Sequence, residues 1–361
     1  MKFLTDKKID IKNLISVLEQ NFEKYHGEDS IIIQDLLFEF KNNDFESITP
    51  QEIHFLNNNP TDIWTDYLIF RYKFKTYPKK KIVSDFPIYL LIEPISACNL
   101  RCIMCFQIDD SFSSDKDFMG RMDLDLFKKV VDEAQMNGTK AITLASRGEP
   151  TLHPKLDEML DYCSGKFFEL KVNTNATKLT EKLSHKILQT GVTDVVFSVD
   201  SYRKDDYERI RVRGVFDTVL DNIKRFKKIR DEFYPNSKCA TRVSGVRVDK
   251  NFDMEAFKKF WEEYVDHVVV VEMENRWDTY HNPLEIGAES PCEYLWERMY
   301  VWFDGKCNPC DADYKSELEV GSIKNNSLKE IWHSQKFEDI RDKHSQKQRK
   351  ECFPCDRCPI G

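Results

Sequence analysis

The sequence predicts an α/β protein built on a parallel sheet, with a helical segment before the sheet and a cysteine-rich segment after it. Segments with strand and helix patterns alternate from about residue 85 onward, and apolar residues recur at helical spacing before that point. In addition, six of the 11 cysteines lie between residues 292 and 358. The expected domains are therefore 1–84, 85–285 and 286–361.

Residues 1–84 are expected to form a helical extension. Thr49, Pro50 and Glu52 have the spacing of a helix start, with Thr49 as the N-cap, proline in the first turn and Glu52 in position for a capping box. An aromatic-rich stretch then runs from residue 64 to 74 and ends near Pro78. Two interpretations stay open, a helical cap packed on the main domain and a module that docks a partner or acts as a lid.

The central region is expected to contain six strands with helices between them. Consecutive strand–helix units form a parallel sheet with right-handed crossovers. The expected strands are residues 89–92, 142–145, 170–172, 195–198, 242–246 and 268–271. The expected helices are residues 124–135, 156–162, 179–188, 216–230 and 254–265.

Three cysteines follow the first of these strands in the run CNLRCIMC. Cys98, Cys102 and Cys105 have C-x3-C-x2-C spacing, which lets three thiolates bind three corners of an iron–sulfur cube and leaves the fourth iron without a protein ligand. An open iron is a site for chemistry, as an open position is in catalytic zinc sites. A zinc knuckle is the alternative, although no histidine or fourth cysteine lies near enough in the sequence to complete it.

The cysteine spacing, the preceding strand and the CNLRC run resemble the radical S-adenosylmethionine (SAM) enzymes. The resemblance implies a partial (β/α)6 barrel and a 4Fe–4S cluster whose open iron is chelated by the amino and carboxylate groups of SAM. Met104 stands where the family usually has an aromatic residue. The resemblance extends over residues 88–361 and does not include the helical extension.

The resemblance also implies SAM contacts at the carboxyl ends of the strands, where parallel α/β folds gather their ligands. The run Arg147-Gly148-Glu149-Pro150 resembles the family's glycine–glutamate motif, in which the carboxylate receives the SAM amino group. Arg147 replaces the first glycine, and an ordinary strand-to-helix turn is the alternative. The other expected contacts are Asn173 and Asn175 through their amides, Ser198 and Asp200 with the ribose, and Arg213 or Arg211 with the carboxylate.

The C-terminal cysteines resemble the SPASM/twitch extension of radical SAM proteins, which binds auxiliary iron–sulfur clusters. Two full clusters need up to about eight ligands, so six cysteines favour one auxiliary 4Fe–4S cluster. The one-cluster twitch form is matched by Cys292, Cys310, Cys355 and Cys358. Cys307 and Cys352 stay open as replacements, because each forms a chelating pair with a neighbour. A zinc ribbon is the alternative.

The implied reaction is reductive cleavage of SAM to methionine and a 5′-deoxyadenosyl radical, which abstracts hydrogen from a substrate. A four-cysteine cluster suits an electron acceptor, so we expect a dehydrogenase-like oxidoreductase that removes two electrons from a small sugar-like or polyol substrate. The candidate substrate residues are Arg276, Asp278 and Tyr280, between the last strand and Cys292. A solvated linker is the alternative for that segment. A maturase or epimerase of peptides or proteins, and a non-catalytic iron–sulfur or zinc scaffold, remain open as functions.

The net charge of −8 is spread along the chain without a long basic stripe, which disfavours nucleic acid as a partner. The apolar runs are too short for a membrane span, and the charged first ten residues do not resemble a signal peptide. We therefore expect a cytoplasmic protein. Its expected electron donor is a flavodoxin or a ferredoxin.

Overall fold

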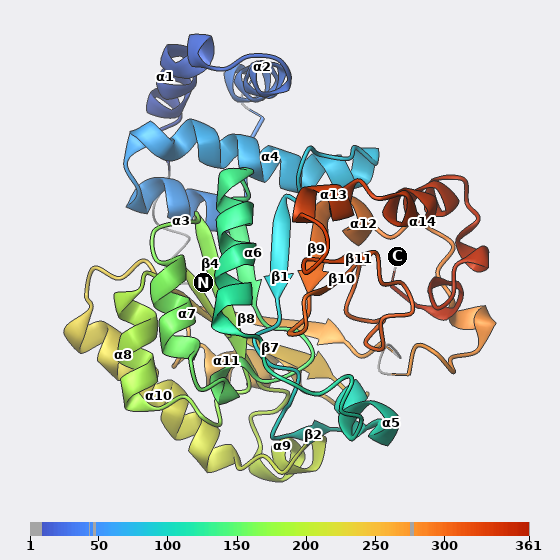
Figure 1. Ribbon diagram of the computed structural model, residues 1–361. Helices are drawn as coiled ribbons and strands as arrows, with labels where there is room; N and C mark the ends of the chain where they lie inside the picture. Colours follow the sequence, from blue (N-terminus) through green and yellow to red (C-terminus); the bar gives the residue numbers. More distant parts are fainter. Residues whose placement is uncertain (1–8, 43, 46–47, 275–277, 361) are drawn as a thin grey trace. The chain divides into compact units, whose positions relative to one another are not determined.

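The computed structural model describes residues 9–42, 44–45, 48–274 and 278–360 (Figure 1). The chain divides into two compact units, Met1–Lys80 and Lys81–Gly361. The first unit is helical. Its elements are α1 (Ile11–Asn21), η1 (Phe22–Lys24), α2 (Glu28–Lys41), α3 (Pro50–Asn58), η2 (Thr61–Ile63) and α4 (Trp64–Lys80).

Helix α3 begins where the sequence predicts. The Thr49 hydroxyl accepts from the backbone N–H of Glu52, and the Glu52 carboxylate accepts from the N–H of Thr49, which completes the capping box. The same carboxylate is fully buried and binds Lys75 Nζ at 2.6 Å, so the start of α3 is tied to α4. One residue thus serves both the cap and the packing of this unit.

The second unit is organised by a nine-stranded sheet with the order β11-β10-β9-β1-β3-β4-β5-β7-β8. All neighbours from β9 to β8 are parallel, and β10 and β11 are antiparallel. The strands of the barrel are β1 (Tyr89–Ile92), β3 (Ala141–Leu144), β4 (Glu169–Thr174), β5 (Asp194–Ser198), β7 (Ala240–Arg247) and β8 (His267–Glu272). The predicted α/β fold with six parallel strands is confirmed.

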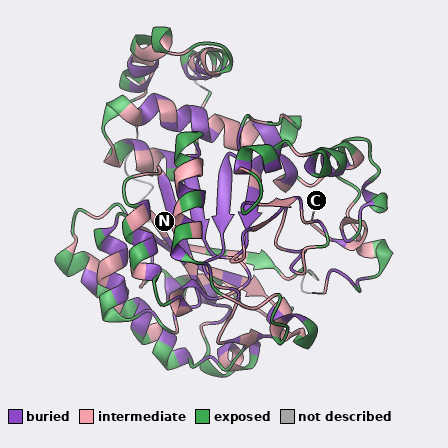
Figure 2. Ribbon diagram, viewed as in Figure 1, coloured by how far each residue is buried: buried purple, intermediate pink, exposed green. Residues whose placement is uncertain are grey.

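Amphipathic helices cover one face of this sheet (Figure 1). They are α6 (Leu124–Met136), α7 (Leu156–Cys163), α8 (Glu181–Gln189), α9 (Lys204–Ile210), α10 (Phe216–Phe233) and α11 (Met254–Trp261). Figure 2 shows their buried stripes turned to the strands and their exposed stripes turned outward. Alternate strand residues, such as Leu144, Val172 and Phe197, pack in the core below the helices. Their neighbours along each strand therefore point to the opposite face of the sheet.

The C-terminal segment continues the sheet of the barrel, which the sequence did not predict. Strand β9 (Arg298–Val301) pairs in parallel with β1, and β10 (Lys306–Asn308) and β11 (Gly321–Ser322) follow it. Helices α12 (Tyr294–Glu297), α13 (Leu328–Trp332) and α14 (Gln335–Ser345) belong to the same segment. Sheet pairing between β1 and β9 therefore joins the two regions that the sequence divides at residue 286.

Several short elements shape the loops at the carboxyl ends of the strands and in the C-terminal segment. A two-stranded antiparallel ribbon joins β2 (Arg101–Cys102) to β6 (Arg211–Val212). The short helices are η3 (Phe106–Ile108), α5 (Asp110–Ser113), η4 (Pro150–Leu152), η5 (Leu284–Ile286), η6 (Arg349–Glu351) and η7 (Cys355–Arg357).

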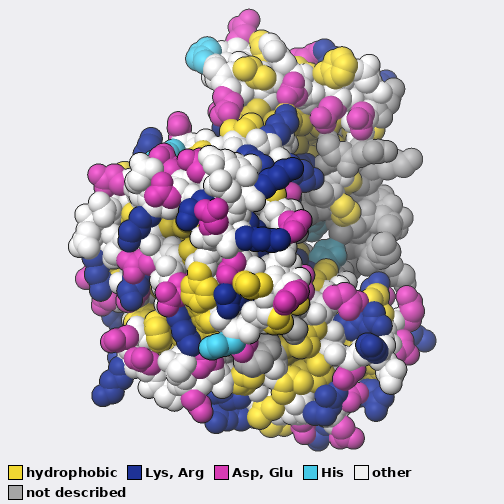
Figure 3. All heavy atoms as spheres, turned by 90° about the vertical axis from the view of Figure 1, so that its right-hand side faces the viewer, with side chains coloured by type: hydrophobic (Ala, Val, Ile, Leu, Met, Phe, Trp, Pro, Cys, Tyr) yellow, Lys and Arg dark blue, Asp and Glu magenta, His cyan; other side chains and the backbone are white. Residues whose placement is uncertain are grey.

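None of the described helices is both long and apolar enough to cross a bilayer. On the face that Figure 3 shows, Lys and Arg side chains are interspersed with Asp and Glu side chains. This distribution agrees with the sequence, in which the charges are mixed along the chain.

A buried ion pair joins the barrel to the C-terminal segment. Arg147, after β3, binds the Glu93 carboxylate through Nε at 2.7 Å and Nη2 at 2.6 Å, and Glu93 directly follows β1. Arg147 Nη1 also donates to the carbonyl of Tyr314 at 2.9 Å, and Glu93 Oε1 accepts from the backbone N–H of Phe303 at 3.2 Å. The two side chains are 2% and 0% exposed, so water cannot replace either partner.

Replacing Arg147 by Met should strongly destabilise the cluster-loaded protein, because Glu93 would keep a buried charge without its partner. We expect the free energy of unfolding to fall by about 3–5 kcal/mol, measured by urea denaturation without oxygen. Lys182→Met is the matched control: it removes an ion pair to Asp157 from a lysine side chain that is 84% exposed. Equal stability of the Arg147→Met variant and this control would contradict the prediction.

Candidate active site and cysteine clusters

Cys98, Cys102 and Cys105 lie in the loop that leaves β1, and local pairing fixes that loop. Cys102 lies in the β2–β6 ribbon opposite Arg211, and the backbone N–H of Cys105 donates to the Cys102 carbonyl at 3.0 Å. Burial raises the pKa of Cys98 to about 11 and that of Cys105 to about 12, and the neighbouring thiols add to both shifts. Cys102 is buried, and Cys98 and Cys105 are partly exposed. Three cysteine sulfurs carried by one short loop form a donor set that fits an iron–sulfur cluster.

The glycine–glutamate turn lies directly against the cysteine loop. A Cβ on Gly148 would stand 2.1 Å from the Ile95 carbonyl oxygen and 2.6 Å from that of Ala97, so only glycine fits. The backbone N–H of Glu149 donates to the Ala97 carbonyl at 3.0 Å. Ser146, at φ 114°, holds a conformation that disfavours a side chain, and its buried Oγ has no hydrogen-bond partner in the described chain.

Glu149 is held where the sequence predicts a SAM contact. Its carboxylate accepts from the Thr174 hydroxyl at 2.6 Å and the Asn175 N–H at 2.7 Å, as well as from Thr151. Burial raises its pKa, although these hydrogen bonds oppose the shift. A buried carboxylate at a strand end fits a cationic partner such as the SAM amino group. Asn175 connects this position to the cysteines, because its Nδ2 lies 3.1 Å from Asn99 Oδ1 and 3.8 Å from Cys98 Sγ.

Asn173 and Ser198 lie on the open face of the sheet, opposite the helices. Their strand neighbours Val172 and Phe197 pack in the core, so the two polar side chains point the other way. The buried Oδ1 of Asn173 has no partner among the described atoms, which fits a donor from SAM. Both residues therefore stay candidates for SAM binding.

Two other expected SAM contacts have different surroundings. Both carboxylate oxygens of buried Asp200 are occupied, by Arg211 Nε at 2.6 Å and by the backbone N–H of Val246 at 2.9 Å. This carboxylate positions Arg211, which lies opposite Cys102. Each carboxylate oxygen can accept a second hydrogen bond, so the contact of Asp200 with the ribose stays a prediction. Arg213 is exposed and has φ 73°. Its contact with a SAM carboxylate stays a prediction.

Four of the C-terminal cysteines converge. Burial raises the pKa of Cys310 well above its usual value, and the nearby groups of Asp313, Cys358 and Cys292 add to that shift. The pKa of Cys355 is also raised, first by its hydrogen bond with Cys352, then by burial and by the nearby Cys310 and Cys292. These influences indicate that Cys310 lies near Cys292 and Cys358, and that Cys355 lies near Cys310 and Cys292. That the four thiolates bind one cluster stays a prediction.

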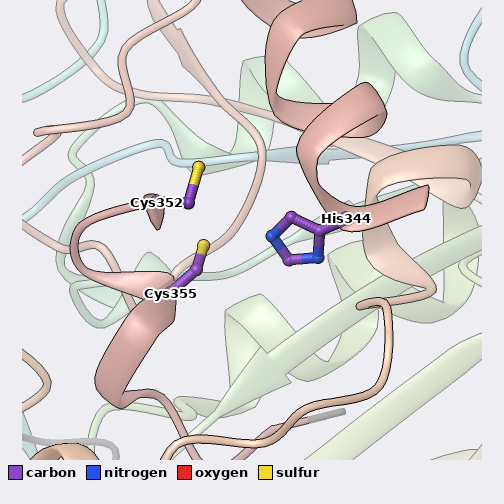
Figure 4. A group of neighbouring side chains, drawn as sticks. All are labelled: His344, Cys352 and Cys355. Carbon is purple, nitrogen blue, oxygen red and sulfur yellow. The ribbon is translucent and has the colours of Figure 1, made fainter. Parts of the chain in front are cut away.

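The two cysteines left open by the sequence differ from each other. Cys307 is fully buried on β10. Burial raises its pKa, and the charged groups that contribute to this shift are Glu133, Glu319 and Asp304 and no cysteine, which separates it from the four other thiols. Cys352 lies beside Cys355, and both sulfurs are within 4.8 Å of a ring nitrogen of His344 (Figure 4). Cys307 is therefore a packing residue, whereas Cys352 borders the cluster site.

Arg349 holds the loops that carry these thiols, and no sequence pattern indicates this role. Its guanidinium donates to the carbonyls of Cys355 at 3.0 Å and Cys358 at 3.0 Å. It also binds the carbonyls of Ser290 and Ile360, so one buried side chain ties the segment before Cys292 to the C-terminal loop. Such a contact joins residues 59 positions apart and has no local sequence pattern.

An aromatic cluster joins the two cysteine groups. Phe106, which follows Cys105, stacks on Tyr314 with ring centroids 4.8 Å apart, and Tyr314 meets Tyr280 edge-on at 5.0 Å. The Tyr280 hydroxyl donates to Asp313 at 2.8 Å and accepts from the backbone N–H of Lys315 at 2.6 Å. Tyr280 is therefore part of the framework between the sites, and its predicted substrate role stays untested.

The other predicted substrate residues lie next to this cluster in the sequence. Asp278 is half-buried, and its Oδ1 lies 2.6 Å from Nδ1 of the exposed His281, which forms a carboxylate–imidazole pair. The charge of Asp278 also contributes to the raised pKa of Tyr314, so the two groups are near each other. Arg276 lies outside the described residues.

Comparisons with known proteins agree with this geometry. The Radical SAM superfamily profile matches residues 92–261, and the profile of the SPASM iron–sulfur cluster-binding domain matches residues 292–359. A tungsten-containing aldehyde ferredoxin oxidoreductase cofactor-modifying protein of Pyrococcus furiosus is 39% identical over 113 residues, 31% of this chain and 30% of that protein. The antilisterial bacteriocin subtilosin biosynthesis protein AlbA of Bacillus subtilis is 24% identical over 314 residues, 76% of this chain and 66% of that protein.

Solved structures share the fold at low sequence identity. BtrN in complex with AdoMet and 2-DOIA has a TM-score of 0.51 and 19% identity, over 75% of this chain and 91% of that chain. Streptococcus suis SuiB bound to precursor peptide SuiA has a TM-score of 0.59 and 16% identity, over 98% of this chain and 88% of that chain. The matched parts span only 30% and 66% of the two curated relatives. The fold, the cysteine geometry and the two profile matches show that this chain belongs to the radical SAM superfamily and carries a C-terminal SPASM iron–sulfur domain.

Proposed function

We propose that this chain oxidises a small, hydroxyl-rich substrate by two electrons, with one SAM-binding 4Fe–4S cluster and one auxiliary 4Fe–4S cluster. The observation that carries the proposal is the convergence of Cys292, Cys310, Cys355 and Cys358, since four thiolates complete the ligand set of a cluster. When bound, the SAM-ligated cluster supplies a 5′-deoxyadenosyl radical for hydrogen abstraction, and the auxiliary cluster supplies an acceptor for one electron.

The chain's own residues bind and orient the reactants. Cys98, Cys102 and Cys105 hold the first cluster, and Glu149, Asn173 and Ser198 hold SAM from the neighbouring strand ends. The aromatic cluster of Phe106, Phe112, Tyr280 and Tyr314 excludes water between the two cysteine groups.

The proton of the substrate hydroxyl needs an acceptor. Loss of a hydrogen atom from carbon, a proton from oxygen and one further electron converts an alcohol to a ketone. Asp278 is the proposed proton acceptor, because its carboxylate is partly exposed and is held by His281 at 2.6 Å. The fold shared with BtrN, whose complex contains AdoMet and 2-DOIA, supports a small-molecule substrate.

A peptide substrate is the second candidate, and one observation favours it. The likeness to SuiB extends over 98% of this chain, including the helical first unit, and that structure contains a precursor peptide. AlbA, by its name, also acts in bacteriocin biosynthesis. Against this candidate, the described residues 9–80 form helices and contain no strand, whereas modules that bind leader peptides often carry a β-ribbon.

The test is SAM cleavage by anaerobically purified protein with dithionite or reduced flavodoxin. We expect 5′-deoxyadenosine, and faster release with a polyol or aminosugar panel than with a panel of unmodified peptides. A substrate deuterated at the oxidised carbon should transfer its label to 5′-deoxyadenosine. Stimulation by peptides alone would favour the second candidate, and no cleavage by iron-loaded, SAM-binding protein under any condition would contradict both.

Cys310 and Cys307 give a matched pair for the auxiliary cluster, because they lie three positions apart and differ only in environment. Cys310→Ala should lose about four iron atoms per chain, since one of four ligands is gone. Cys307→Ala should keep its iron, because that thiol packs in the apolar core. Iron and sulfide analysis measures both, and iron loss in the Cys307 variant would contradict the ligand assignment.

Gly148→Ala should weaken SAM binding, because the new Cβ would collide with the carbonyls of Ile95 and Ala97 and displace Glu149. We expect at least about a tenfold rise in the SAM dissociation constant, or about 1.4 kcal/mol, measured by equilibrium dialysis. Gly138→Ala is the control for backbone strain without a collision, because Gly138 has φ 83° and no atom lies within 4 Å of its added Cβ. Equal SAM affinity in the two variants would refute the role of Gly148.

A further inference from the structure

A buried histidine faces the auxiliary cluster site without a role in the proposed ligand set. His344 lies in the last turn of α14 and is 0% exposed. Figure 4 shows its ring edge turned to the side chains of Cys352 and Cys355. A ring nitrogen and the two sulfurs all lie within 4.8 Å of one another, the one such group of possible metal ligands found in the described parts of the chain.

The hydrogen bonds of His344 decide what its ring can do. The backbone N–H of Cys292 donates to His344 Nδ1 at 3.1 Å, so the lone pair of Nδ1 is already used. A neutral imidazole has one lone pair and one N–H in its ring plane, so Nε2 must carry the proton. Buried Nε2 has no hydrogen-bond partner of normal geometry in the described residues.

This tautomer argues against a separate metal site at the three residues. To bind a metal, Nε2 would need its lone pair, so the ring proton would move to Nδ1. The backbone N–H of Cys292 would then face the Nδ1–H group and lose its acceptor. As a donor, however, Nε2–H is suited to thiolate sulfur, and the nearest sulfurs belong to Cys352 and Cys355. His344 thus links the backbone of one proposed cluster ligand, Cys292, to the sulfur of another, Cys355.

We propose that His344 is a positioning residue that raises the reduction potential of the auxiliary cluster by donating Nε2–H to the Cys352–Cys355 sulfur pair. The proposal rests on the proposed function, in which Cys355 is a ligand. A hydrogen bond to a sulfur ligand stabilises the extra negative charge of the reduced cluster, so reduction becomes easier. Cys352 is the unligated member of the pair and relays the contact.

Two substitutions separate the support of Cys292 from the contact with sulfur. Asparagine can accept near the position of Nδ1 but does not reach that of Nε2, whereas the glutamine amide can donate near Nε2. His344→Asn should keep both clusters and lower the potential of the auxiliary cluster. At a fixed potential the reduced-to-oxidised ratio should fall about tenfold, which is about 59 mV for a one-electron couple. His344→Gln should restore most of the ratio.

EPR-monitored redox titration of the anaerobically reconstituted full chain measures these ratios for each cluster. The potential of the SAM-binding cluster should not change, and His333→Asn, an exposed histidine of the same domain, should change neither cluster. An unchanged auxiliary potential in His344→Asn would overturn the proposal. An equal fall of the auxiliary potential in His344→Asn and His344→Gln would also overturn the proposal. A purely structural role of His344 predicts that glutamine does not restore the potential.

Cys352→Ala keeps the proposal testable if the His344 variants do not fold. It should retain about four auxiliary iron atoms per chain, because Cys352 is not a ligand, and it should lower the auxiliary potential. Loss of the auxiliary cluster in this variant would make Cys352 a ligand and overturn the proposal. Failure of the proposed function is distinct: Cys310→Ala would then retain all of its iron.

Discussion

The buried ion pair between Glu93 and Arg147 is the contact on which the arrangement of this enzyme depends. It joins the end of β1, the turn that carries Glu149 and the carbonyl of Tyr314 in the C-terminal domain. Neither charge reaches water, so the pair is stable only when all three segments are in place. The proposed SAM site and the SPASM domain are therefore built on the same strand end.

Two further contacts extend this constraint. Strand β9 pairs with β1 over its whole length, which makes the C-terminal domain a continuation of the barrel sheet. Phe106 stacks on Tyr314, so the residue after Cys105 packs four residues beyond Cys310. The two cysteine groups are thus joined through packed side chains, which suits the electron transfer proposed between a substrate and the auxiliary cluster.

The sequence predicted the six parallel strands and most of the helices, because buried strands and amphipathic helices have local periodicities. It also predicted the three-cysteine loop, whose spacing is itself the chemical signal. It did not predict that β9 joins β1, because pairing between distant strands leaves no local pattern. The pairing of Asp200 with Arg211 and the carbonyl contacts of Arg349 were missed for the same reason.

Among the candidate residues, the sequence predicts where the polar groups at strand ends lie. It does not predict which groups they form hydrogen bonds with. Glu149 and Asn175 lie together beside Cys98, as parallel strand ends require. Tyr280 is expected to contact substrate, and that role stays a prediction. Its hydroxyl bonds with Asp313 and Lys315 have no sequence signal. His344 gave no sequence signal, because its significance comes from a tautomer fixed by a residue 52 positions away.

The central claim is that this chain holds one open and one closed iron–sulfur cluster. The most direct measurement is the EPR spectrum of the reduced, reconstituted protein before and after SAM is added. The account predicts two cluster signals, of which SAM changes only one, and that one is absent from a Cys98→Ala variant. A single signal, two signals that SAM leaves unchanged, or two that it changes alike would contradict the account.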